Sequence, residues 1–184
     1  MPRCEALPTP IDGLMILQRF RIDDDRGFLS RVYAADEFRG AGLTKPIVHI
    51  NHTLTRRRGA VRGMHFQLPP HAETKVVSCL RGEVCDVAVD LRRHSSTFLA
   101  WHAERLSPEN QRSLLIPEGF AHGFQALTDD CELLYLHTAA YAPAAESAVN
   151  AIDPRLAIRW PIDIADLSER DRRHPMLTPA FEGI

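Results

Sequence analysis

Three short segments of the chain combine glycine with polar residues that a plain β-fold does not need. The segments are GAVRGMHFQ (59–67), IPEGFAHGF (116–124) and CELLYLHTAAY (131–141). In the first, Arg62 and His65 lie three residues apart, and Gly59 and Gly63 flank them, so a ligand could approach the backbone closely. An imidazole changes its charge near neutral pH and can act as a general base. The same pattern also fits a structural histidine, so both interpretations stay open for His65 taken alone.

The second segment contains a motif that resembles one found in the cupin superfamily. Pro117, Gly119 and His122 form the pattern P-x-G-x-x-H, which resembles the second cupin motif. Metal-dependent cupins add an H-x-H pair and a carboxylate in their first motif, because a transition metal needs three or four converging ligands. The corresponding run here is His65-Phe66-Gln67, which lacks the second histidine. We therefore expect no metal site, although His65 and His122 with Glu73 remain an alternative ligand set.

Positive charge is concentrated in one stretch, at Arg56, Arg57, Arg58 and Arg62. Such a stretch is either a solvated face of the protein or an anion site, since guanidinium groups bind phosphate oxygens in pairs. A diphosphate would satisfy the second interpretation. The net charge of −2 gives no general reason to expect nucleic acid as a partner.

The composition is that of an ordinary folded protein. The 184 residues are 45% hydrophobic and 25% charged, which suits one domain spanning residues 1–184 and argues against disorder. The opening MPRCEALPTPIDG lacks the apolar core of a signal peptide, and no stretch reaches the roughly 18 apolar residues of a membrane span. We therefore expect a cytoplasmic protein without membrane contact, whose four cysteines lack a CxxC spacing and are reduced.

The elements that must position the polar segments are mostly strands. Val76–Leu91 predicts a hairpin broken near Gly82, in which Cys85, Val87 and Val89 share one face. Further strands are predicted at 15–22, 46–51, 98–105, 113–116, 123–127 and 132–137, a helical turn at 34–39 and a helical tail over 163–174. Short strands at close spacing predict a β-sandwich or barrel.

Taken together, these and other segments resemble the dTDP-4-dehydrorhamnose 3,5-epimerase family. The segments that carry the resemblance are RGFLSRVYAADEF (26–38), AVRGMHFQLPP (60–70), TKVVSCLRGEVCDVAVDLRRHSSTF (74–98), LSPENQRSLLIPEGFAHGF (106–124), Glu132 with Tyr135, YAP (141–143), RWP (159–161) and LSERD (167–171). They run in the family's order from about Gly13 to Leu177. The resemblance implies a mainly β fold, a cupin-type double-stranded β-helix (jelly-roll) barrel with short C-terminal helices, and an enzyme that uses neither metal nor cofactor.

The resemblance also implies a reaction and the residues that carry it. In that family a His–Asp pair removes a proton beside the C4 ketone of a nucleotide-linked 4-keto-6-deoxyhexose, inverting C3, C5 or both. By motif position, the catalytic residues are the base His65, its partner Asp171, the proton donor Tyr135 on the opposite face of the sugar, and Lys75 near the ketone. The substrate-binding residues implied in the same way are Arg26, Phe28, Arg31, His49, Asn51, Arg62, His122, Tyr141, Glu146 and Arg170.

These residue types suit the chemistry. A proton beside a carbonyl is too weakly acidic for an isolated imidazole, so a cation such as Lys75 or Arg62 must stabilise the developing enolate. An aspartate on the far imidazole nitrogen fixes the tautomer and stabilises the imidazolium. Inversion needs a second group on the other face, because a base acting alone returns the proton to the side from which it came.

The sequence departs from the family pattern at four positions. The family usually has glutamate at Arg31, glutamine at His49 and lysine at Leu136 and Arg170. Arginine at 170 keeps the charge, whereas Arg31 reverses one. The base, the sugar and the number of inverted centres therefore stay open.

The resemblance predicts a dTDP-sugar epimerase in deoxysugar or dTDP-L-rhamnose-type biosynthesis, and two other function classes remain as alternatives. One is a metal-dependent cupin isomerase or oxygenase, which the missing H-x-H pair disfavours. The other is a cupin that binds sugar nucleotides without turnover. The resemblance also implies a homodimer in which the N-terminal strand crosses to the partner, so that Arg26 and Arg31 serve the neighbouring site.

Overall fold

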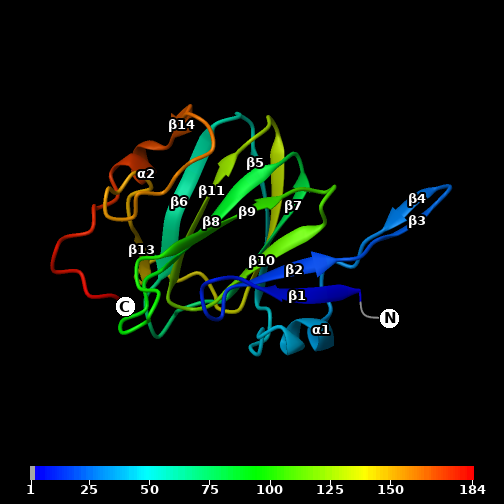
Figure 1. Cartoon of the computed structure of the whole chain (residues 1–184), viewed down its shortest axis with the longest axis horizontal. Coiled ribbons are helices and arrows are strands. Elements are labelled where there is room, and N and C mark those ends of the chain that lie inside the picture. The colour runs from blue at the N-terminus through cyan, green and yellow to red at the C-terminus, as the bar shows by residue number, and fades with distance from the viewer. Residues whose placement is uncertain (1–2) are drawn as a thin grey trace.

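Two sheets, antiparallel apart from one short parallel pairing, form the body of the protein in a computed structural model that describes residues 3–184 (Figure 1). The first sheet has the order β1 (Cys4–Pro8), β2 (Met15–Arg19), β10 (Arg112–Ile116), β7 (Lys75–Arg81), β12 (Cys131–His137) and β5 (His49–Thr55). The second has the order β13 (Glu146–Ala148), β6 (Ala60–Gln67), β11 (Phe120–Ala126), β8 (Val84–Asp90) and β9 (Trp101–Leu106), and β14 (Asp166–Leu167) pairs with β6. The mainly β fold predicted from the strand spacing is confirmed.

Both faces of the central strands are covered by apolar groups. One core cluster lies between the sheets and includes Val77 of β7 and Phe124 of β11. The other face of the second sheet packs against the C-terminal segment, and there Cys85, Val87 and Val89 contribute to one cluster as predicted. Because β8 is covered on both faces, all seven of its residues are buried.

The hairpin predicted over Val76–Leu91 is wrong. The two strands exist, but β7 pairs with β10 and β12, whereas β8 pairs with β9 and β11 in the other sheet. The turn between them, with Gly82 at a φ of 75°, is a corner that carries the chain from one sheet to the other. Each of the two strands has a neighbour on both edges, which suits its largely apolar sequence. The two strands do not pair with each other, although they are adjacent in the sequence.

The helices are shorter than the tail pattern predicts. The helical turn near 34–39 is confirmed as α1 (Ala35–Gly40), which buries Phe38 against the first sheet. In the tail, only α2 (Glu169–Arg172) is helical, and Asp166–Leu167 is strand β14. The Oγ of Ser168 accepts a hydrogen bond from the backbone N–H of Asp171 at 3.0 Å, which caps α2 and holds Asp171 against β6.

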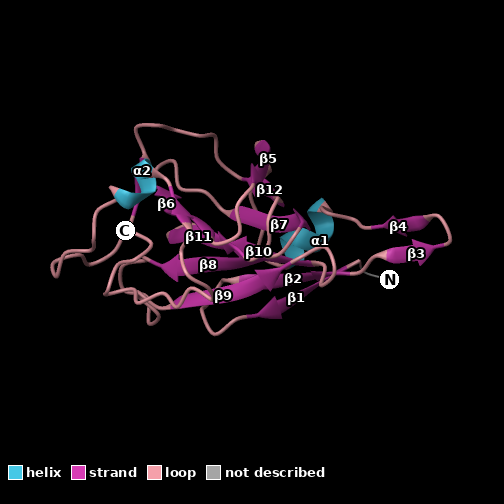
Figure 2. Cartoon of the chain, turned by 90° about the horizontal axis from the view of Figure 1, so that it is seen from above, coloured by secondary structure: helices cyan, strands magenta, loops and turns pink. Residues whose placement is uncertain are grey.

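One hairpin stands apart from the two sheets. The strands β3 (Ile22–Asp24) and β4 (Gly27–Leu29) pair only with each other and project from the end of the molecule opposite α2 (Figures 1 and 2). The side chains of Ile22, Phe28 and Leu29 are exposed on it. Among residues 3–184, no helix is long and apolar enough to cross a membrane.

Candidate active site

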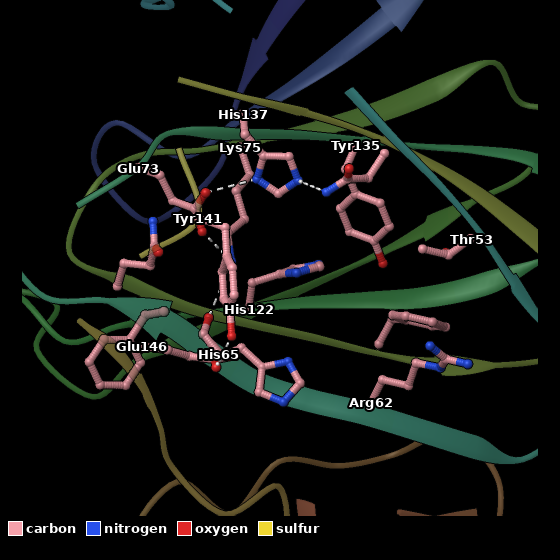
Figure 3. A pocket seen from close by; sticks show the side chains of 14 residues that line it. Thr53, Arg62, His65, Glu73, Lys75, His122, Tyr135, His137, Tyr141 and Glu146 are labelled. Atoms are coloured by element: carbon pink, nitrogen blue, oxygen red, sulfur yellow. Dashed lines mark hydrogen bonds and ion pairs between the residues drawn. The ribbon is translucent and has the colours of Figure 1, made fainter. Parts of the chain in front are cut away.

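A cavity of about 260 Å³ opens between the two sheets, and strands from both sheets line it (Figure 3). The strand β6 supplies Arg62 and His65, and the facing wall includes Tyr135 from β12. The other lining residues are Asn51, Thr53, Phe66, Gln67, Glu73, Lys75, His122, Phe124, His137, Tyr141 and Glu146. Most of the polar residues singled out in the sequence therefore meet in one place.

His65 and Asp171 form a hydrogen-bonded pair at the edge of this cavity. The His65 Nε2 atom lies 2.7 Å from Asp171 Oδ1, and Asp171 is buried on α2. Burial opposes ionisation of Asp171, but the hydrogen bond and charge of His65, together with the hydrogen bond of His174, outweigh it and lower the pKa of the carboxyl. Because an ionised carboxylate only accepts hydrogen bonds, Nε2 carries the ring proton and Nδ1 keeps a free lone pair. The pair can therefore act as a general base.

A second histidine–carboxylate pair lies deeper in the barrel. His122 Nε2 lies 2.8 Å from Asp86 Oδ1, and both residues are buried. The two histidines His65 and His122 face each other in register on β6 and β11. The ring of His122 packs edge-on against Tyr135 at 6.0 Å between centroids, so the pair holds one side of the tyrosine ring.

Tyr135 faces this arrangement from the other sheet. Desolvation, followed by the negative charge of Asp86, raises the pKa of the phenol, so Tyr135 keeps its proton over the physiological range. The ring of His137 also packs against Tyr135, at 5.9 Å between centroids and 15° between planes. A protonated phenol held in place by two imidazoles is suited to donate a proton into the cavity.

A third histidine–carboxylate pair was missed by the sequence reasoning. Glu73 Oε2 accepts from His137 Nδ1 at 2.8 Å and Glu73 Oε1 contacts Lys75 Nζ at 3.1 Å, while Asn51 Nδ2 lies 3.3 Å from His137 Nε2. Burial opposes ionisation of Glu73, but His137 and Lys75 lower its pKa. The signal for His137 was its position two residues after Tyr135 on one strand face, which places both side chains toward the same cavity. Glu73 had been weighed only as a metal ligand.

The rim of the cavity carries a second small network. Tyr141 donates its hydroxyl to Glu146 Oε2 at 2.7 Å, and Arg170 forms an ion pair with the other oxygen of Glu146. A neighbouring hollow of about 540 Å³ shares Arg62 and His65 with the cavity and is also lined by Arg56, Arg57 and Arg170. Three arginines of the charged stretch, Arg56, Arg57 and Arg62, therefore line a concave surface, whereas Arg58 donates to the carbonyl oxygen of Leu127.

Four predicted substrate-binding residues line neither the cavity nor the neighbouring hollow. Arg26 and Phe28 lie on the β3–β4 hairpin, where the Arg26 side chain is 90% exposed. Arg31 follows that hairpin and forms an ion pair with Glu37. His49 is exposed at the start of β5, on the strand face that carries Asn51 and Thr53 but beyond the cavity. Within residues 3–184 of one chain, these four are not brought to the site.

The alternative metal set of His65, His122 and Glu73 does not form a cluster, because each of these residues is paired with a different partner. Within the described part of the chain, the group with three closely spaced donors is His65, Asp171 and His174, whose ligand atoms lie within 4.8 Å of one another. These donors are hydrogen bonded to one another, and arginines line the adjacent hollow, which disfavours a cation. We therefore interpret the group as a hydrogen-bonded chain.

Comparison with known proteins decides the family. The sequence profile described as dTDP-4-dehydrorhamnose 3,5-epimerase matches residues 8–179. The chain belongs to this family. A dTDP-4-dehydrorhamnose 3,5-epimerase of Pseudomonas aeruginosa is 47% identical over 171 residues, which cover 92% of this chain and 93% of the relative.

Solved structures of similar proteins agree with this assignment. A dTDP-6-deoxy-D-glucose-3,5-epimerase from Legionella pneumophila in complex with dTDP-4-keto-L-rhamnose has a TM-score of 0.89 at 37% identity, covering 94% of this chain and 92% of that one. A 3′-monoepimerase from Streptomyces bikiniensis in complex with dTDP-quinovose has a TM-score of 0.85 at 35% identity, covering 92% and 86%. With these neighbours and its two-sheet topology, the fold is the predicted cupin-type jelly-roll barrel.

Proposed function

We propose that the protein is an epimerase that inverts C3, C5 or both in a dTDP-linked 4-keto-6-deoxyhexose, in deoxysugar biosynthesis of the dTDP-L-rhamnose type. The observation that carries the proposal is the placement of His65 with its buried Asp171 on one wall of the cavity and the protonated Tyr135 on the other. Base and acid on opposite walls are what an inversion requires. The family and its dTDP-sugar complexes support the substrate class.

In the proposed mechanism, His65 removes the proton from the carbon beside the C4 ketone. The C–H electron pair forms the C=C bond of an enolate, and the negative charge moves to the C4 oxygen. Lys75 stabilises that charge, since cations positioned where charge develops lower the barrier by about 3 kcal/mol each. Tyr135 then protonates the carbon from the opposite face, the ketone re-forms, and His65 and Tyr135 exchange protons with solvent.

The nucleotide is assigned to the arginine-lined hollow beside the cavity. Guanidinium groups of Arg62 and Arg170 suit the two phosphates, because their forks match phosphate oxygens. The remaining substrate-binding residues in or at the cavity are Asn51, His122, Tyr141 and Glu146. The hollow shares His65 with the cavity, which would place the sugar of a bound nucleotide against the base.

A homodimer would complete the site. Arg26 and Phe28 on the projecting hairpin, and Arg31 beside it, do not line the cavity of their own chain, and exchange of the N-terminal segment would carry them to the partner. Exposed apolar side chains at Ile22 and Leu29 suit burial between two copies. We place this homodimer in the cytoplasm, where the four free cysteines would stay reduced.

The test is conversion of dTDP-4-keto-6-deoxyglucose in D₂O, followed by NMR and mass spectrometry of the product. Inversion with two deuterium atoms gained would establish 3,5-epimerisation, and one would establish a single-centre enzyme. The CDP- and GDP-linked ketosugars serve as base controls. Failure to exchange or invert any of the three substrates would overturn the proposed function.

A further inference from the structure

The carboxylate of Asp171 is shared by two imidazoles. Oδ1 lies 2.7 Å from His65 Nε2 and 3.0 Å from His174 Nε2. The two rings pack edge to face, with 5.3 Å between centroids and 85° between planes. Because the pKa of Asp171 is lowered, its carboxylate is ionised near neutral pH and only accepts hydrogen bonds, so both Nε2 atoms carry protons. His174 is therefore a second donor on the atom that orients the proposed base.

The backbone around His174 is held by specific contacts. The buried Asn150 donates its side-chain amide to the carbonyl oxygens of Arg172 and His174, at 3.1 and 3.0 Å, and its backbone N–H donates to Pro175 O at 3.0 Å. The His174 N–H itself bonds to Asp171 O at 3.3 Å. The turn after α2 is thereby fixed, and the His174 side chain is only 13% exposed.

A second donor changes what the carboxylate does for His65. Negative charge on Oδ1 that is shared with His174 is less available to stabilise the imidazolium that forms when His65 takes a proton. The same bond restrains rotation of the carboxylate, which keeps Oδ1 in line with His65. His174 does not line either the cavity or the arginine hollow, so it acts through Asp171.

We propose that His174 is a positioning residue of the epimerase, which fixes Asp171 on His65 and keeps His65 deprotonated, and therefore active, to lower pH. This inference rests on the proposed function, in which His65 is the base. His174 is not among the residues to which the family resemblance assigns a function.

Other charged groups also face His65. They are Arg62 on β6, Lys75 on β7, Glu146 on β13, Arg170 on α2, Arg56 and Arg57 after β5, and Asp166 on β14. All of them remain in a variant at position 174. A change in the pH profile of such a variant therefore reports on the bond between His174 and Asp171.

Two variants separate charge sharing from simple packing. His174→Ala removes the donor, so His65 should stay protonated to higher pH, and the acid limb of kcat/KM should move up by roughly half to one pH unit. The variant should then lose about three- to tenfold in kcat/KM at pH 6 and much less at pH 8, with KM little changed. His174→Gln keeps a neutral N–H donor and should restore the acid limb toward that of the wild type. His102→Ala removes a histidine beside Glu104 on β9, away from the cavity, and serves as the matched control.

The same question can be answered without substrate, by ¹⁵N NMR of the histidine rings in the wild-type protein. We expect both His65 and His174 to carry the proton on Nε2, and the titration of His65 to move to higher pH in His174→Ala. A proton on Nδ1 of His174, or equal pH-independent losses in the Ala and Gln variants, would overturn the inference. If no ketosugar is turned over but the NMR titrations are coupled, the proposed function fails and the inferred coupling stands.

Discussion

The barrel cavity and the β3–β4 hairpin differ in whether their side chains find partners within the same chain. In the cavity, three histidine–carboxylate pairs converge, and each carboxylate is held by partners of the same chain. On the hairpin, Arg26 forms an ion pair with its neighbour Asp24 while its side chain stays 90% exposed, and Phe28 is 59% exposed. In the proposed homodimer, the proton transfers would therefore belong to one subunit, and the hairpin of the second copy would contribute to substrate binding.

The largest effect is expected at the partner of the base. In Asp171→Asn the new amide can donate to His65 Nε2 and would place the ring proton on Nδ1, the nitrogen assigned to the substrate. We expect kcat to fall by about 10³- to 10⁴-fold with little change in fold, as for a wrong-tautomer variant. Steady-state kinetics with circular dichroism as the folding control measure this, and a loss below tenfold would show that Asp171 does not set the tautomer.

At Tyr135 we expect a smaller loss, which affects inversion of the sugar carbon and not proton removal. Tyr135→Phe keeps the ring that packs against His122 and His137 but removes the proton donor. Epimerised product should fall by about 10²-fold, while deuterium exchange without inversion persists, because His65 can still remove and return a proton on one face. NMR of the recovered substrate distinguishes the two. Equal loss of exchange and inversion would assign Tyr135 to a step before proton removal.

The hairpin should affect binding and not chemistry. For Arg26→Ala we expect KM to rise by about tenfold, the value of one charge-assisted contact, with kcat nearly unchanged. Mixing Arg26→Ala with His65→Ala subunits tests where Arg26 acts. If the hairpin serves the partner, each hybrid dimer regains one intact site and the low-KM activity returns. A hybrid without regained activity would place Arg26 in its own subunit's site or outside the site altogether.

The smallest effects are expected on stability, and they should differ between a carboxylate in the barrel and one on the hairpin. Burial opposes ionisation of Asp90 at the end of β8, but hydrogen bonds from Arg92, Ser95 and Thr97 lower its pKa to about 2. A depressed pKa adds stability above the ordinary carboxyl range, which is lost as pH falls through about 2. Asp90→Asn should therefore cost roughly 2 kcal/mol at pH 7.

The matched hairpin variant is Asp24→Asn. Arg26 also lowers the pKa of Asp24, but that pair is exposed and should not change the unfolding free energy measurably. Urea unfolding of the wild type and both variants at pH 7 and pH 3 measures the loss of unfolding free energy in each variant. The loss in Asp90→Asn should be smaller at pH 3 than at pH 7. Equal stabilities of the two variants would contradict a structural function for the Asp90 network.

Several features of fold and site could be predicted from the sequence because they depend on local pattern. The alternation of Cys85, Val87 and Val89 predicted the correct face of β8. The motif positions predicted residues that lie together: His65, Lys75 and Tyr135 line one cavity, and Asp171 is bonded to His65. Sheet partners could not be predicted, because strand pairing depends on contacts distant in sequence. The same limit hid the bond between His137 and Glu73, which lie 64 residues apart.

The positions that depart from the family pattern also show what local sequence can and cannot predict. Arg31 pairs with Glu37 in its own chain, so its reversed charge is compensated locally. His49 lies on the face of β5 that carries Asn51, but beyond the cavity. Its position in the family pattern could not predict its distance from the cavity. Nothing in the structure explains the leucine at position 136 beyond its burial beside Phe38 and Leu43.

The central claim is that His65 removes the proton, and hydrogen exchange beside the ketone tests it most directly. Solvent deuterium uptake into dTDP-4-keto-6-deoxyglucose should be followed by mass spectrometry for the wild type, His65→Ala and the control His102→Ala. We expect uptake by the wild type and the control and a loss of at least about 10³-fold in His65→Ala. Uptake by His65→Ala at the wild-type rate would show that another group is the base.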